Sequence, residues 1–479
     1  MNERKQAAVA SVDASAALYK RLSDELWAHP ELSLKETFAA ERYCSALRDL
    51  GFTVTENLGG IQTAFCGAFG HGRPVLGFLG EFDALSGLSQ AAGETEPRPL
   101  QAGAPGHGCG HNLLGVASLA AAVAVKEYLQ TTGREGTVVF YGCPGEEGGS
   151  GKAFLARDGA WKELDAALTW HPADVNEVRT GTNNSSIQVL YKFHGVAAHA
   201  ASAPEQGRSA LDAVSLMNVG AQFLREHVTP DCRVHYAVLD TGGASPNVVQ
   251  AEASVLYMIR ANKVRDTVAL TKRVDKIAEG AALMTETRLE RVFIDGTAEI
   301  VPNFTLESVL YRNFEEVGVP TYTDEEKAFA AALQKTAPAQ TEAPGTGARF
   351  DAEIAAAVRE KTNGLTSPLN DFLMPLYHGT GFVPGSSDVG DVSWQTPAAQ
   401  IAAVTWPAGA QGHTWQTVAC GKSSIAEKGM LTAAKVLACS AIDLFEDPAL
   451  LAEARAEFER RAAEGYVCPI EEGASPIAL

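Results

Sequence analysis

The chain has 479 residues, of which 46% are hydrophobic and 20% are charged, proportions typical of a globular protein with more than one domain. Its formal net charge of −19 opposes binding to nucleic acids and to anionic membranes. Its eight cysteines have no disulfide-framework spacing and the N-terminus shows no targeting segment, so we expect a cytoplasmic protein.

The first part of the chain, to about residue 182, alternates helical and strand patterns. Helices are expected at 16–28 and 37–50, and strands at 52–56, 63–68 and 74–79. The Gly- and Pro-rich segment 86–108 is expected to form a loop over a site. The uncharged apolar stretch 113–125 predicts a buried helix that is too short to span a bilayer.

Two neighbouring carboxylates, Glu146 and Glu147, follow a strand predicted at 137–141. Carboxylates placed near a core are costly unless a cation accompanies them. A metal is the usual solution, with one carboxylate as ligand and the other as proton carrier. For such a pair taken alone, a solvent-exposed acidic turn is the alternative.

Three further segments contain possible metal ligands. Cys109 and His111 stand two residues apart among glycines, and thiolate with imidazole suits zinc or a similar divalent metal. His171 directly follows a strand predicted at 165–170, and His413 lies in a later Gly-flanked turn. Because sites in open parallel sheets form beyond strand ends, the joint pattern predicts a metal centre.

The pattern changes between residues 185 and 298. Strands are expected at 186–193, 233–240, 255–260 and 287–294, and helices at 209–228 and 266–284. This βαββαβ order is typical of a ferredoxin-like unit. Since the unit separates His171 from His413, the metal-binding domain must be discontinuous, at 1–184 and 299–479. Segment 335–380, with a helix candidate at 351–361, fits either an active-site loop or a peripheral excursion.

Several motifs occur in one order along nearly the whole chain. They include Glu81-Phe-Asp-Ala-Leu, His107-Gly-Cys-Gly-His, Pro144-Gly-Glu-Glu, Gly195-Val-Ala-Ala-His and Gly412-His-Thr. The chain therefore resembles the aminoacylase/carboxypeptidase-G family of dinuclear metallohydrolases, in the branch with auxin-conjugate and p-aminobenzoyl-glutamate hydrolases. The resemblance implies an α/β fold: a metallopeptidase-type catalytic domain with a mainly parallel central sheet, and an inserted ferredoxin-like lid or dimerisation domain at 185–298.

The resemblance also assigns roles to individual residues. It implies two divalent metal ions, zinc or manganese, held by Cys109, His111, Glu147, His171 and His413. The remaining assignments are Glu146 as general base, Asp83 as a residue that orients a ligand, His199 as a group that polarises the carbonyl in a neighbouring subunit's site, and Asn247 and Arg260 as binders of the substrate carboxylate. Without the resemblance, Arg260 would be read as a surface charge at a strand end.

The implied reaction is metal-dependent hydrolysis of a small-molecule N-acyl amino acid, with p-aminobenzoyl-glutamate as the expected substrate. An aminoacylase, an auxin-conjugate hydrolase or a dipeptidase would use the same mechanism and remains open. A different alternative is a partner chain of a heteromeric amidohydrolase. The expected assembly is accordingly a homodimer, or a heterodimer with a related chain.

Overall fold

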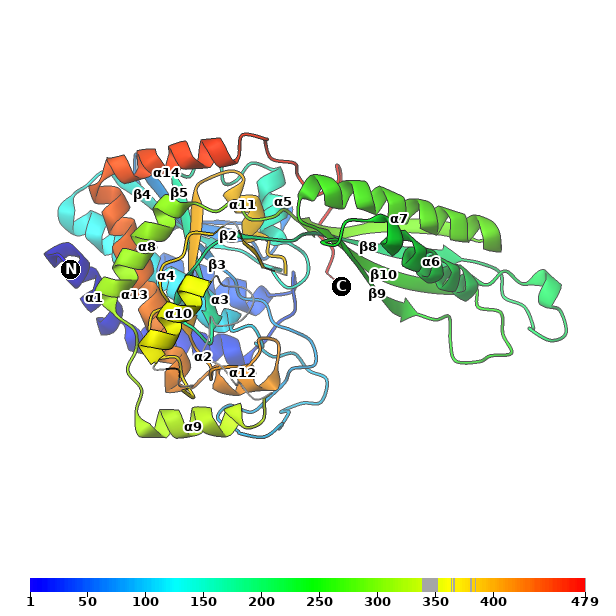
Figure 1. Cartoon of the computed structure of the whole chain (residues 1–479), viewed down its shortest axis with the longest axis horizontal. Helices are drawn as coiled ribbons and strands as arrows, with labels where there is room; N and C mark the ends of the chain where they lie inside the picture. Colours follow the sequence, from blue (N-terminus) through cyan, green and yellow to red (C-terminus); the bar gives the residue numbers. More distant parts are fainter. Residues whose placement is uncertain (338–351, 363, 365–366, 380, 384, 479) are drawn as a thin grey trace.

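The computed structural model describes residues 1–337, 352–362, 364, 367–379, 381–383 and 385–478. Figure 1 shows a larger layered α/β unit and a smaller one that projects from it. The predicted α/β fold class is confirmed. The prediction for segment 335–380 falls partly outside the described residues; within it, α10 (Ala352–Thr362) agrees with the helix expected at 351–361, apart from Asp351, which also lies outside them.

The larger unit is built on a seven-stranded sheet in the order β1-β2-β4-β3-β5-β13-β6. These strands are β1 (Thr53–Glu56), β2 (Phe65–His71), β3 (Val75–Gly80), β4 (Gly136–Gly142), β5 (Ala166–Ala173), β6 (Glu177–Arg179) and β13 (Ala398–Val404). The four central strands, β4, β3, β5 and β13, run parallel, and antiparallel strands extend the sheet at both edges. The carboxyl ends of the parallel strands therefore lie at one edge.

Helices surround this sheet. They are α1 (Glu3–Ala14), α2 (Ala16–Ala28), α3 (Thr37–Asp49), α4 (His111–Thr132), α5 (Gly151–Arg157), α8 (Phe304–Val317), α9 (Asp324–Gln334), α11 (Val389–Ser393), α12 (Trp415–Cys420), α13 (Ser424–Glu446) and α14 (Pro448–Arg461). Alternate residues of β4 pack on opposite faces: Val138 and Phe140 lie in a core with α4 and α13, and Val139 in a core with α5. Both faces of the sheet are thus buried, as in parallel sheets generally.

Helix α4 is longer than the stretch 113–125 that was expected. It continues because Tyr128 and Leu129 still reach the core, and it ends where Gly133 adopts a positive φ of 64°. By length and composition alone this helix could cross a membrane, but 89% of its most apolar window is buried inside the protein. It is therefore a core helix, as predicted.

The expectation that His171 lies just beyond its strand is wrong. Strand β5 runs to Ala173, because β13 pairs with it in parallel as far as the Ala173–Val404 pair. Pro172 therefore does not end the strand. The imidazole of His171 consequently leaves from regular, paired backbone rather than from a loop.

The smaller unit has the predicted βαββαβ order. Its elements are β8 (Ser185–His194), α6 (Ala210–Leu224), β9 (Arg233–Asp240), β10 (Glu252–Ala261), α7 (Val264–Thr285) and β11 (Arg288–Thr297). The antiparallel sheet has the order β11-β8-β10-β9, which leaves β9 as an edge strand. The domain limits 184/185 and 298/299 stay a prediction.

Short elements complete the described chain. They are β7 (Thr182–Asn183), which pairs with β12 (Phe382–Val383), and the 3₁₀ turns η1 (Leu58–Gly60), η2 (Pro204–Gln206) and η3 (Arg225–His227). Segment 86–108 has no helix or paired strand beyond a single bridge between Leu85 and Gly106, as expected for a loop.

Candidate metal centre

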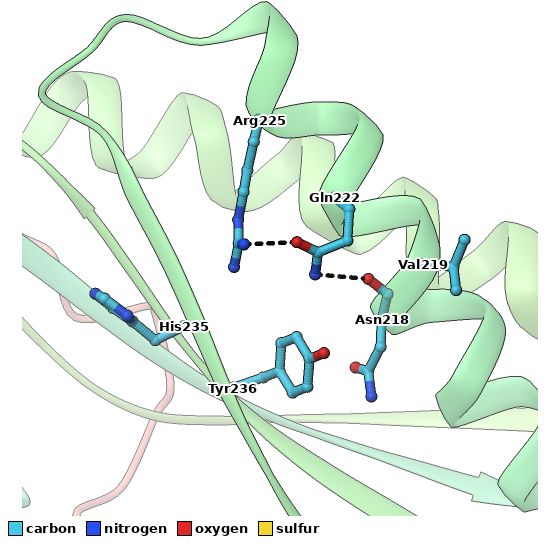
Figure 2. Close-up of a pocket in the computed structure, with 6 residues that line it drawn as sticks. All are labelled: Asn218, Val219, Gln222, Arg225, His235 and Tyr236. Atoms are coloured by element: carbon cyan, nitrogen blue, oxygen red, sulfur yellow. Dashed lines mark hydrogen bonds between the residues drawn. The ribbon is translucent and has the colours of Figure 1, made fainter.

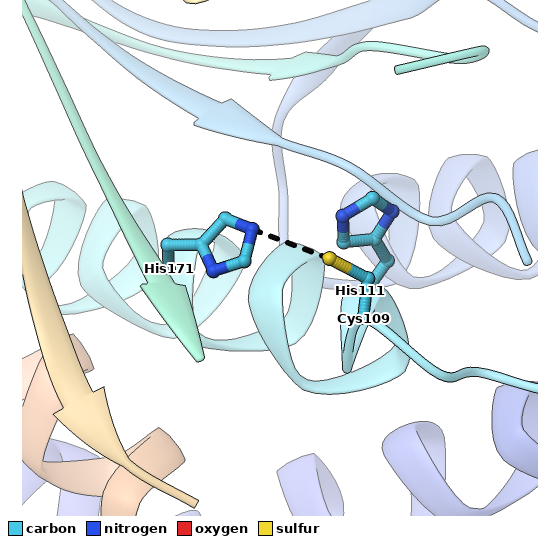
Figure 3. A group of neighbouring side chains, drawn as sticks. All are labelled: Cys109, His111 and His171. Carbon is cyan, nitrogen blue, oxygen red and sulfur yellow. Dashed lines mark hydrogen bonds between the residues drawn. The ribbon is translucent and has the colours of Figure 1, made fainter. Parts of the chain in front are cut away.

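The five predicted metal ligands come together at the carboxyl edge of the parallel strands. Two sets, each with ligand atoms within 4.8 Å of one another, share one thiol: Cys109–His111–His171 and Cys109–Glu147–His413. Figure 3 shows the first set, with His171 directed at the sulfur from β5. The Cys109 Sγ atom lies 3.4 Å from Nε2 of His171. The shared thiol places Cys109 between the two sets.

The turn before α4 allows this close approach. Gly110 has a φ of 76°, and a Cβ atom there would lie only 2.9 Å from the Pro172 side chain. Only glycine fits such a position without strain. Cys109 and His111 flank it, so the turn aims a thiol and an imidazole at the same place, as the glycine-rich sequence predicts.

Asp83 orients the His111 ring. Its Oδ1 atom lies 2.9 Å from His111 Nδ1, while Oδ2 accepts hydrogen bonds from the Ser33 hydroxyl at 2.7 Å and the Glu147 N–H at 2.9 Å. Burial would raise the pKa of Asp83, but the hydrogen bond and charge of His111 lower it to about 2. An ionised Asp83 keeps the proton on Nδ1, so the lone pair of Nε2 faces the site.

Three buried polar atoms of this site have no hydrogen-bond partner: Glu81 Oε2, His111 Nε2 and Glu147 Oε1. His111 Nε2 lies 3.3 Å from Glu81, and His413 Nε2 lies 3.2 Å from Glu147 Oε1, without the geometry of hydrogen bonds. Buried polar atoms are rarely left unsatisfied, and lone pairs that face each other require a cation between them. The donor set of thiol, imidazole and carboxylate groups therefore fits divalent metal ions.

Glu146 lies beside these ligands. Its carboxylate is within 4.8 Å of the ligand atoms of Glu81 and His111. Burial raises the pKa of Glu146 well above its ordinary value, and the charges of Glu81, Glu147 and Asp388 raise it further. A carboxylate with a raised pKa can accept a proton and return it, which suits the predicted role of general base.

The two histidines farthest from α4 differ in environment. Burial lowers the pKa of His171, and the nearby charge of Arg179 lowers it further. His171 Nδ1 contacts the Pro172 carbonyl oxygen at 2.7 Å, which leaves Nε2 to face Cys109. Contact with the Glu147 carboxylate raises the pKa of His413, whose side chain is 54% exposed. His413 thus forms the open side of the site.

A buried charge cluster behind the ligands was not predicted. Lys152 Nζ lies 2.7 Å from Glu81 Oε1 and 2.6 Å from Asp388 Oδ1, and none of the three side chains is more than 3% exposed. Although burial opposes it, the charges of Asp388 and Glu81 raise the pKa of Lys152 well above its ordinary value. The cluster fixes Glu81, whose second oxygen faces His111. A lysine directly after the Gly-Ser-Gly turn was the available signal.

The three predicted residues of the smaller unit lie at its two ends. Arg260 is at the end of β10 nearer the larger unit, is half-buried rather than on the surface, and donates to the Ser386 hydroxyl at 3.3 Å. His199 and Asn247 are exposed in the loops that follow His194 and precede Glu252, two residues paired at the other end of the sheet. At about 3.3 Å per residue, Glu252 and Arg260 are roughly 26 Å apart. One chain therefore does not bring Asn247 and Arg260 together.

Two sets of soft and hard ligands at the edge of an open α/β sheet, beside a carboxylate with a raised pKa, define a metal-dependent hydrolase. Residues 182–285 match the family described as a peptidase dimerisation domain. Over 476 residues the chain is 45% identical to one of the two kinds of chain that bear the name p-aminobenzoyl-glutamate hydrolase in Escherichia coli (strain K12), covering 98% of each sequence.

Solved structures share the fold. An aminobenzoyl-glutamate utilization protein from Klebsiella pneumoniae superposes with a TM-score of 0.57 and 16% identity, over 90% of this chain and 97% of that one. The Bacillus subtilis protein YXEP, a dinuclear metal binding peptidase from the M20 family, gives a TM-score of 0.54 and 15% identity, over 91% and 99%. The chain belongs to the M20 family and is a metal-dependent amidohydrolase, which confirms the resemblance seen in its motifs.

Proposed function

We propose that this protein hydrolyses the amide bond of N-aroyl amino acids of the p-aminobenzoyl-glutamate type, and releases p-aminobenzoate and glutamate. One observation carries the proposal: the E. coli relative named for this reaction aligns at 45% identity over 98% of both chains. The proposed metal ligands are the five that cluster at the sheet edge, Cys109, His111, Glu147, His171 and His413. Zinc or manganese suits a set that mixes thiolate, imidazole and carboxylate.

Each residue of the site then has a chemical task. When bound, two divalent metal ions would polarise the amide carbonyl and lower the pKa of a water molecule. Glu146 takes the proton of the attacking water and returns it to the leaving nitrogen. Asp83 holds the His111 ring in the orientation that ligation needs. Arg260, half-buried and without a described carboxylate within 4.0 Å, binds the free carboxylate of the substrate.

His199 acts in this proposal from a second chain. Its Nδ1 atom accepts hydrogen bonds from the Ala201 and Ser202 N–H groups at 3.2 and 3.1 Å, so its proton is on Nε2. That N–H, exposed in a loop, is able to donate to the oxygen that becomes negative as the water attacks. Asn247, exposed in the adjacent loop, accompanies it into the partner's site.

The surface of the smaller unit supports association through this unit. Edge strand β9 and helix α6 expose apolar side chains, and a hollow of about 490 Å³ lies between them (Figure 2). The exposed apolar residues are Leu216, Val219, Phe223, Tyr236, Val238 and Leu239. An edge strand with exposed apolar neighbours pairs readily with another chain. We take that chain to be a second copy; a related but different chain is the alternative, because the E. coli hydrolase has two differently named subunits.

Cysteine chemistry supports a reducing compartment, and we place the protein in the cytoplasm. All eight cysteines are unpaired, including the proposed ligand Cys109. A thiolate that binds metal is sensitive to oxidation, so activity is expected to require a reductant.

The test is amide hydrolysis by the purified chain alone, loaded with zinc or manganese under reducing conditions. The substrates are p-aminobenzoyl-glutamate, N-acetyl amino acids, auxin conjugates and dipeptides, with Glu146→Gln as the blank. Selective release of p-aminobenzoate supports the proposal. Selective cleavage of another conjugate keeps the mechanism and replaces the substrate. No cleavage by the metal-loaded chain, with activity restored by a related chain, assigns the protein to a heteromeric enzyme.

A further inference from the structure

A second cavity of about 330 Å³ lies on the far side of β13 from His171. Its walls come from β6, from the segments 374–377 and 385–387, and from Gln400 of β13. A cavity of this size holds a small molecule. None of the residues that line it is a proposed metal ligand, so its contents would be the part of a substrate that does not react.

Arg179 of β6 lines this cavity. In the paired strands, Arg179 stands opposite Gln400, and Gln400 stands opposite Thr169, two residues before His171. Paired residues, and residues two apart on one strand, project from the same face of a sheet. The side chains of Arg179 and His171 therefore leave the sheet on the same face, two strands apart.

The Arg179 guanidinium has no acidic partner in the part of the chain that the structure describes. No described carboxylate lies within 4.0 Å of it, and no described residue accepts a hydrogen bond from its side chain, although the residue is half-buried. A guanidinium removed from water is costly unless an anion pairs with it. Its planar set of N–H donors matches a carboxylate in two parallel hydrogen bonds.

A second guanidinium reaches the same cavity. Ser386 lines the cavity and accepts a hydrogen bond from Arg260 Nη1 at 3.3 Å. The other nitrogens of Arg260 contact the Met258 sulfur, at 3.2 Å and 2.8 Å, rather than a carboxylate. Two half-buried cations thus serve one cavity. A ligand with two carboxylates would complement both.

We propose that Arg179 is a specificity-determining residue, which binds the side-chain carboxylate of an acidic amino acid while Arg260 binds the α-carboxylate. This inference rests on the proposed function and narrows its substrates to N-acyl derivatives of glutamate or aspartate. Neutral amino acids would leave Arg179 buried without a counter-charge. The selection therefore acts against them as well as in favour of acids.

The experiment compares p-aminobenzoyl-glutamate with p-aminobenzoyl-glutamine, which has the same size but no side-chain charge. In Arg179→Gln, kcat/KM for the glutamate conjugate is expected to fall about 10–100-fold, mainly through KM, because one charge-assisted contact is lost. The value for the glutamine conjugate should change by less than about 3-fold, and Arg179→Lys should be intermediate. Equal losses on both substrates, or no loss, would overturn the proposal.

Binding of the free product separates this inference from the proposed reaction. Calorimetry on the metal-loaded protein measures glutamate and glutamine binding whether or not any conjugate is cleaved. Wild type is expected to prefer glutamate and Arg179→Gln to lose about 10–100-fold of that affinity, with glutamine unaffected. Absence of cleavage together with this preference would reject the reaction and retain the carboxylate site. Absence of the preference in wild type would reject the carboxylate site.

Discussion

Replacement of Lys152 by methionine is expected to destabilise the catalytic domain strongly. Lys152 Nζ lies 2.7 Å from Glu81 and 2.6 Å from Asp388, and the three side chains are 0%, 3% and 0% exposed. Without the cation, two buried carboxylates have no counter-charge, a change that costs about 3–5 kcal/mol. At about 1.36 kcal/mol per tenfold change, the unfolding constant should rise by roughly 10²–10⁴.

Urea unfolding of the metal-free protein at pH 8 measures this cost, with a reductant present and the fluorescence of buried tryptophans such as Trp161 and Trp170 as the signal. Lys20→Met is a matched control, because Lys20 Nζ lies 2.9 Å from Asp24 while the two side chains are 37% and 28% exposed. A surface pair of this kind contributes at most about 1 kcal/mol.

Combination with Asp388→Asn provides an internal check. In that background Lys152→Met should cost less, since one buried carboxylate rather than two loses its cation. If Lys152→Met unfolds within about 1 kcal/mol of wild type, and no more easily than Lys20→Met, the argument from buried charge is wrong.

Three further outcomes are expected. Asp83→Asn should weaken metal affinity about 10–100-fold, because the amide no longer fixes the protonated Nδ1 of His111; unchanged competition with a chromogenic chelator would contradict this. Glu146→Gln should lower kcat about 10²–10⁴-fold while metal content, measured by atomic emission, stays at the wild-type value; a variant that loses both would be a ligand variant instead. Burial raises the pKa of Asp391 to about 8, so the folded state binds this proton more tightly than the unfolded state, and the stability that the group provides is lost as pH rises from about 4 to 8. Asp391→Asn should therefore lose less stability than wild type over this window in urea titrations; parallel curves would refute the assignment.

The elements with one buried face could be predicted from sequence, because their apolar residues repeat with a clear period. Helix α2 and strand β9 begin and end at the predicted residues, and the order of the ferredoxin-like unit is as expected. Helix α13 is buried on nearly all sides, so no polar face marks its period, and the sequence does not single it out.

The ligands of the metal centre could also be predicted, since each stands in a local glycine-rich or strand-end pattern. The Lys152 cluster could not, because Glu81, Lys152 and Asp388 are far apart in the chain and each looks like an ordinary surface charge. Only packing of β3, α5 and the segment before α11 brings them together. The pairing that holds His171 within β5 is likewise a property of the neighbouring strand β13.

The position of His199, at the end of the smaller unit away from Arg260, has a genetic consequence under the proposed exchange between chains. Each reaction centre would then be composed of two gene products. Two inactive alleles, His199→Ala and Glu146→Gln, would form mixed pairs in which one of the two centres has both groups intact. Random pairing of equal amounts would thus restore about a quarter of wild-type turnover, and dilution below the pairing constant would abolish it.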